Sequence, residues 1–220
     1  MELINVEFIT LDLHGVKFGQ MIGEPKEQIE NIQPYSNYDS LINGIRNNLS
    51  NYIFQLACCY EYGAIFSIKD EQKRVRLISP NIETALLFYE IAYRSGSEDA
   101  ANQLGMMYHH GVHVKADKNV SKELFRYAAS KNNVNALFIM GVYLIHELDY
   151  TTGYDYFLRA ADLGHAAACF NVALALHNGD IVWGKNNPQA LYYAKTALDQ
   201  MPDDVECEQL INKIYNEIMK

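Results

Sequence analysis

The sequence predicts an all-α protein: an α-α solenoid, that is, a right-handed superhelix of helix pairs, with a short extended or hairpin element at the N-terminus. Two observations favour this fold class. From Tyr52 onward one helix-pair pattern recurs, and its small and aromatic residues return at fixed positions, which is typical of stacked repeats. The chain also has 220 residues, of which 49% are apolar and 20% charged, so it can bury a sizeable core.

Residues 1–50 precede the repeats, and we expect them to form an N-terminal element followed by a first helix. Early in this stretch apolar and polar side chains roughly alternate, and residues 11–15 suit a hairpin turn. Residues 24–38 contain two prolines and many polar side chains, which is typical of a linker. Asp39 is a suitable N-cap for a helix that ends near Asn48.

The repeats occupy residues 51–202 in about four copies of two helices each. The first helix has an apolar anchor, then a small residue, then Tyr or an apolar residue four positions after the anchor. The anchors are Leu56, Leu104, Met140 and Val172. Because one helix pair is too small to bury its apolar face, successive pairs must stack. The small residues Gly105 and Gly141 are expected to let neighbouring helices approach closely.

Two irregular segments and a final helix complete the array. The first step between anchors is long because residues 64–80 are expected to form an extended loop, with the basic residues Lys69, Lys73, Arg74 and Arg76. The third copy is short because Glu147, Leu148 and Asp149 replace the Gly-rich loop. Residues 203–220 are predicted to form a capping helix that begins after Asp203 or Asp204 and ends at Met219. Its packing residues are expected to be Val205, Leu210, Ile214 and Ile218.

The second copy resembles the Sel-one-like repeat family, which is related to the tetratricopeptide repeats. The matching residues are Leu104-Gly105, Tyr108, Gly111, Val114, Asp117 and Ala128-Ala129. The copy departs from the family pattern at His113 and Asn132, which replace glycines. The resemblance implies an α-solenoid that binds other proteins, usually through a concave face lined by the first helices. It implies no enzymatic activity and no cofactor.

Composition excludes several classes of function. Acids outnumber bases 27 to 18 and give a net charge of −9, which argues against non-specific nucleic-acid binding and favours a basic protein partner. The sequence lacks an apolar stretch of about 20 residues, so no membrane association is expected, and its acidic N-terminus indicates a cytoplasmic protein rather than a secreted one. The four cysteines lack metal-binding spacing and are expected to be buried apolar fillers.

Histidines recur near the same end of successive first helices. They are His109 and His110, His146, and His177. Three interpretations stay open: a solvated helix terminus, where His suits the C-terminal dipole; a polar partner-binding edge; or a zinc site between repeats. We expect no metal requirement.

Acidic residues dominate the C-terminal half. Between residues 140 and 212 there are ten acids and three bases. Two interpretations stay open: a merely solvated face, or a docking surface on which Asp149, Asp155 and Asp180 contact a basic partner. Trp183 lies in an acidic loop and is a candidate binding hot spot, although it equally suits packing on a neighbouring helix.

A third candidate feature is the row of residues that lie two positions after each anchor. These residues are unusually apolar for side chains expected to face solvent. The row consists of Cys58, Met106, Val142 and Leu174. Met106 and its neighbours form either an adaptable contact stripe or part of the core between repeats.

The sequence therefore favours a non-enzymatic binding protein. One version is an inhibitor or immunity protein that binds and neutralises a toxic effector enzyme. The other is an adaptor or regulatory scaffold that assembles cellular proteins. An enzyme is a distant third, because we find no phosphate-binding Gly loop, G-x-S-x-G or H-E-x-x-H motif in the sequence.

Overall fold

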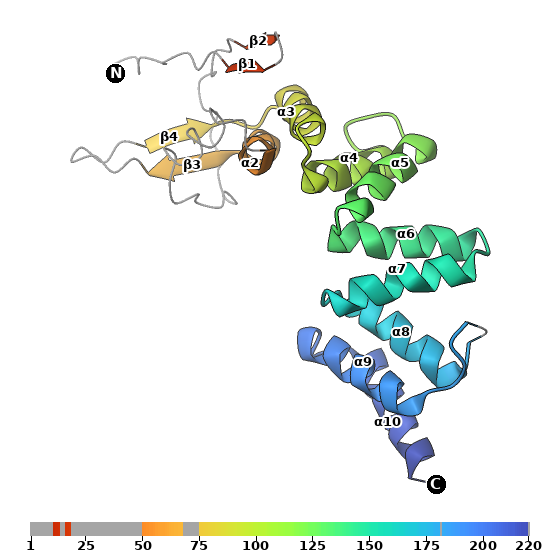
Figure 1. Cartoon of the computed structure of the whole chain (residues 1–220). Coiled ribbons are helices and arrows are strands. Elements are labelled where there is room, and N and C mark those ends of the chain that lie inside the picture. Colours follow the sequence, from red (N-terminus) through yellow and green to blue (C-terminus); the bar gives the residue numbers. More distant parts are fainter. Residues whose placement is uncertain (1–10, 14–15, 19–49, 68–74, 181, 220) are drawn as a thin grey trace. The chain divides into compact units, whose positions relative to one another are not determined.

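The computed structural model describes residues 11–13, 16–18, 50–67, 75–180 and 182–219 (Figure 1). The chain divides into two compact units. The first comprises Met1–Met107 with Gly111–Lys115, and the second comprises Tyr108–His110 with Ala116–Lys220. The predicted helix from Asp39 to about Asn48 lies outside the described residues.

The first unit contains two short antiparallel strand pairs. β1 (Leu11–Leu13) pairs with β2 (Val16–Phe18), in keeping with the expected N-terminal hairpin. β3 (Ala64–Ser67) pairs with β4 (Val75–Ile78), which corrects the expected extended loop over residues 64–80. Both strands of the second pair are short runs rich in apolar and β-branched residues, which is typical of strands. The basic residues between the two runs favoured the prediction of a loop instead. Of these bases, Arg76 lies in β4, whereas the other three lie outside the described residues.

Three helices complete the first unit: α2 (Ser50–Tyr62), α3 (Ile82–Arg94) and most of α4 (Glu98–His110). α2 packs on α3 through aromatic rings, with Tyr60 stacked on Phe88 at 5.6 Å between centroids. The buried Tyr89 donates its hydroxyl hydrogen to Glu61, so that its polar end is satisfied inside the unit.

The second unit contains the end of α4 and six further helices. These are α5 (Lys118–Ser130), α6 (Val134–His146), α7 (Tyr150–Asp162), α8 (Ala166–Asn178), α9 (Asn187–Gln200) and α10 (Val205–Ile218). Figure 1 shows α6 beside α7 and α8 beside α9. Each helix begins after a residue whose side chain accepts a backbone N–H bond from the first turn: Asp117, Asn133, Asp149, His165, Asn186 and Asp204.

The repeat anchors are buried as predicted. Leu56, Leu104, Met140 and Val172 are each at most 7% exposed. The close approach at Gly141 is also confirmed: a Cβ atom there would lie 2.6 Å from the Phe157 ring of α7. Gly153 completes the crossing from the α7 side, where a Cβ atom would lie 2.8 Å from Ile145. Gly105 is buried in α4, and the close approach expected there stays a prediction.

α10 is present and begins after Asp204, as expected. Its packing face, however, is shifted from the predicted one: Leu210 and Ile214 are buried, whereas Val205 is 60% and Ile218 46% exposed. Cys207 and Ile211 are buried together with Leu210 and Ile214. These four residues follow the three- and four-residue spacing of a single helix face. Val205 departs from that spacing, and Ile218 is the exposed last residue of α10.

The predicted burial of the cysteines is confirmed for Cys59, Cys169 and Cys207, while Cys58 is half-buried. Burial raises the pKa of the Cys59 thiol to about 12 and that of Cys207 to about 11. The thiolate form is therefore disfavoured, and these side chains act as small apolar fillers.

Three-residue turns with one shared geometry join several helices. In each, the middle residue has a positive φ, and the next residue caps the following helix. The middle residues are Gly96, Asn132, Leu148 and Gly164. The last two backbone N–H groups of each turn bond to carbonyl groups of the preceding helix, as Leu148 and Asp149 do with Ile145 and Leu144. The described helices thus form a helical repeat solenoid.

Candidate partner-binding surface

The last turn of α4 brings a histidine pair to α6. His109 Nδ1 lies 2.6 Å from the Tyr143 hydroxyl oxygen, and its ring meets that of His110 edge-on at 4.7 Å. Burial, followed by the nearby His110 and Lys118, lowers the pKa of His109, so the ring is neutral at pH 7. His110 is exposed at the helix end. The structure therefore splits this pair into one ring that links two helices and one that faces solvent.

The other two histidines of the predicted row also differ. His146 is exposed at the end of α6. His177 is only 2% exposed, and its Nδ1 lies 3.0 Å from Asn187 Oδ1 while its Nε2 lies 3.7 Å from Glu217 Oε1. Because its ring connects α8 to the start of α9 and to α10, it presents nothing to a partner. The prediction that placed His177 on the binding edge is corrected.

Glu217 is the centre of that connection. It accepts hydrogen bonds from Lys185 Nζ at 2.7 Å and from Asn187 Nδ2 at 3.2 Å. These two bonds lower the pKa of Glu217 to about 2, so the carboxylate is charged across the physiological range. The network holds the end of α10 against the loop before α9.

The three candidate acids have different local roles. Asp149 is the N-cap of α7 and accepts a bond from the Thr152 backbone N–H at 3.2 Å. Asp180 accepts the hydroxyl hydrogen of Tyr154. Asp155 is exposed on α7. The acids thus share a negative charge, but two of them also hold local structure.

Trp183 packs on a neighbouring helix, which is one of the two interpretations offered by the sequence, and its role as a binding hot spot stays a prediction. It is half-buried in the loop after α8, and its ring packs on Tyr154 of α7 with 4.9 Å between centroids. Burial, together with the bond to Asp180, raises the pKa of Tyr154, which therefore stays a neutral donor. The loop after α8 is fastened to α7 by this ring contact and this hydrogen bond.

The apolar row is partly covered. Cys58, Met106 and Val142 are half-buried, and Leu174 is 36% exposed. Met106 lies in the part of α4 that belongs to the first unit, whereas His109 and His110 belong to the second.

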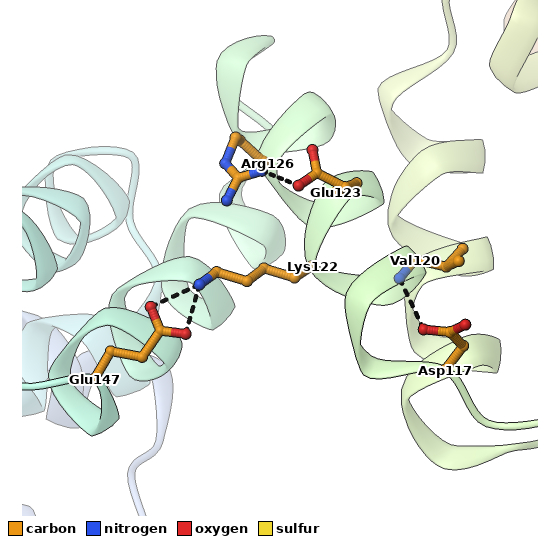
Figure 2. Close-up of polar contacts among 6 residues, drawn as sticks. All are labelled: Asp117, Val120, Lys122, Glu123, Arg126 and Glu147. Atoms are coloured by element: carbon orange, nitrogen blue, oxygen red, sulfur yellow. Dashed lines mark hydrogen bonds and ion pairs between the residues drawn. The ribbon is translucent and has the colours of Figure 1, made fainter.

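The α6–α7 turn contains two exposed apolar residues that sequence reasoning missed. Leu148 is 71% and Tyr150 40% exposed. The turn is held in place by Glu147, which pairs with Lys122 of α5 through both carboxylate oxygens at 2.5 and 2.6 Å (Figure 2). The sequence does contain the signal: a leucine stands at the position where neighbouring turns have glycine or asparagine.

Metal binding was a minor alternative for the histidines. Within the described ranges, no group of three or more His, Cys, Asp or Glu side chains is arranged to hold a metal ion. The expectation that the protein needs no metal stays a prediction.

The Sel1 repeat family model matches residues 50–73, 76–97, 98–133, 136–165 and 166–200. The chain belongs to the Sel1 repeat family. Five segments are matched, and the first two divide the region that the anchor spacing treats as one copy. Sel1 repeat proteins are typically non-catalytic scaffolds that bind other proteins.

Solved structures share this Sel1 repeat fold. A Sel1 repeat protein from Oxalobacter formigenes is 20% identical with a TM-score of 0.62, and the match covers 80% of this chain and 67% of that one. A protective antigen with the same fold from uropathogenic Escherichia coli is 20% identical with a TM-score of 0.60, and the match covers 80% of this chain and 36% of that one.

Immunity protein Pa5087 from Pseudomonas aeruginosa is 20% identical with a TM-score of 0.47, and the match covers 73% of this chain and 56% of that one. No curated protein matches the chain. None of the described helices has the length and apolar character required to cross a bilayer.

Proposed function

We propose that this Sel1 repeat protein is an inhibitor, an immunity protein that binds and neutralises a toxic effector enzyme. The main supporting observation is the charge of the second unit. Residues 140–180 contain five acids against the single base Arg159, and Asp149 and Asp155 are exposed. Such a field attracts a basic protein and speeds association, which suits an inhibitor that must capture an enzyme before the enzyme acts.

The proposed contact residues lie mainly on the second unit. They are His109, His110, His146, Asp149, Asp155, Asp180 and Trp183, with Met106 on the first unit. His110, His146 and Asp155 are exposed and therefore accessible to a partner. The partner is expected to be a protein with a basic docking surface, in the cytoplasm, with no part played by nucleic acid or membrane.

The experiment begins with capture of the partner from the native host on the tagged full-length chain. The partner is then expressed alone and together with the chain. An inhibitor predicts that the partner alone stops growth and that co-expression restores it. The alternative, an adaptor, predicts that the partner is harmless alone and that the chain joins it to a second protein. A harmless partner would overturn the inhibitor proposal.

A further inference from the structure

The turn between α6 and α7 has a leucine where the fold favours glycine. Leu148 has a φ of 65°, whereas Gly164 takes the same position in the next turn of the second unit and Asn132 in the preceding one. A side chain with a Cβ atom is disfavoured in this left-handed region, and glycine and asparagine tolerate it best. Leucine is therefore the less stable choice for this turn.

Within the part of the chain that the structure describes, little compensates for this choice. The Leu148 side chain is 71% exposed, so it buries little apolar surface in the folded monomer. Tyr150 follows at 40% exposure, so two large apolar side chains face solvent within three residues. Contact with another molecule would bury both.

The exposed pair continues into a larger apolar surface. Tyr150 and Tyr154 are four residues apart on α7, so they lie on one face of that helix. Tyr154 in turn packs against Trp183. Leu148, Tyr150, Tyr154 and Trp183 therefore form one edge of the second unit, which we call the Leu148 edge.

The charges around this edge indicate what would cover it. Two bases close to the edge already have partners: Lys122 pairs with Glu147, which precedes Leu148, and Lys185, two residues after Trp183, pairs with Glu217. Asp149, the N-cap of α7, lies between Leu148 and Tyr150 in the sequence, Asp155 follows Tyr154 on α7, and both acids are exposed. The complement is a surface that combines aliphatic and cationic side chains, since aromatic rings and carboxylates both attract arginine.

We propose that the Leu148 edge docks a basic, aliphatic segment of the partner protein. Its aliphatic side chains cover Leu148 and Tyr150, and its arginine or lysine side chains face the flanking acids. This inference rests on the proposed function in taking the occupant to be a protein. It goes further in naming the edge and the chemistry of the segment that binds it.

The single tryptophan of the sequence, Trp183, lies in the edge and reports binding by its own fluorescence. The full-length chain is titrated with three short synthetic peptides, which alternate arginine with leucine, glutamate with leucine, or arginine with serine. We expect a saturable change with the arginine–leucine peptide and at least about tenfold weaker binding of the other two. No saturation, or equal binding of either control peptide, would overturn the proposal.

Two leucine variants then locate the contact. Leu148→Gly is expected to weaken binding of the arginine–leucine peptide about tenfold while raising the melting temperature, because it removes both the contact and the unfavourable backbone conformation. The matched control is Leu163→Gly, since Leu163 is also a turn leucine and is 52% exposed. It should leave binding unchanged. Equal binding by Leu148→Gly and the unchanged chain, or equal weakening by both variants, would contradict the proposal.

These measurements do not depend on toxicity. If the peptide binds as expected but the captured partner is harmless, the Leu148 edge stands and the inhibitor proposal fails. If the chain restores growth but the edge binds no basic peptide, the inhibitor proposal stands and the inference about the edge fails.

Discussion

The backbone of Leu148 lies in the left-handed region at a φ of 65°, so its cost to stability is measurable. Replacement by glycine should stabilise the fold by about 1 kcal/mol and raise the melting temperature by about 2–4 °C. The reverse test is Gly164→Ala, since Gly164 has a φ of 86° and a Cβ atom there would meet nothing closer than 3.9 Å. That variant should be destabilised by a similar amount. A Leu148→Gly protein with an unchanged or lower melting temperature would contradict the assigned turn geometry.

Protonation of His165 provides a second test. Its Nδ1 accepts the Ala168 backbone N–H at 3.2 Å and so caps α8, and burial lowers its pKa below the ordinary value of 6.5. The unfolded chain then binds more protons than the folded one between these two pKa values. The free energy of unfolding is therefore expected to be greatest above about pH 6.5 and to fall as the pH falls toward the folded pKa.

The matched variant for this test is His165→Asn, because asparagine is a good N-cap that does not titrate. Unfolding in denaturant at pH 7.5 and pH 5 should show a smaller loss of stability in the variant. His109, whose pKa is also lowered, retains its share of the pH dependence in both proteins. An identical loss in both would show that His165 does not titrate in this way.

Sequence reasoning succeeded for residues that repeat and failed for residues whose partners are distant. The anchors Met140 and Val172 were identified because helix periodicity alone assigns them to the core. His177 was misplaced because its partner Glu217 is far along the chain and no local pattern reveals the contact. Leu148 was missed because its signal, a leucine where neighbouring turns have glycine or asparagine, is visible only once the turns are aligned by their backbone dihedral angles.

The crossing of α6 and α7 depends on two glycines that face each other. Gly141→Leu would place new atoms against Phe157, where even a Cβ atom would be 2.6 Å away, and should cost about 1–3 kcal/mol or more by forcing the helices apart. Asn135→Leu on the same helix is the control, because Asn135 is exposed. Thermal unfolding should show a clear loss for the first variant and little change for the second. Equal stability of both would place the helix crossing elsewhere.

Among the elements, the predicted helices were largely correct and one strand pair was missed. The start of α10 followed from its capping residue Asp204. The pairing of β3 with β4 was not anticipated, since each strand is only four residues long and a basic segment separates them. Short apolar runs do not by themselves distinguish a strand from a loop.

The second unit combines an acidic field with an exposed apolar edge. Replacing Asp149 or Asp180 by lysine would also disturb the fold, because Asp149 caps α7 and Asp180 accepts the hydroxyl hydrogen of Tyr154. Asparagine at these positions retains a cap and a hydrogen-bond acceptor while it removes charge. The contribution of charge to binding is therefore separable from its contribution to folding.

The rate at which the captured partner associates with the full-length chain decides whether the acidic part of the second unit docks a basic partner. The variant replaces Asp149, Asp155 and Asp180 by asparagine, and the matched control replaces the exposed acids Asp203, Glu206 and Glu208 by their amides. At low salt we expect the first variant to associate about tenfold more slowly, with a weaker salt dependence, and the control to stay close to the unchanged chain. Equal association rates for all three proteins would contradict docking of a basic partner on this part of the second unit.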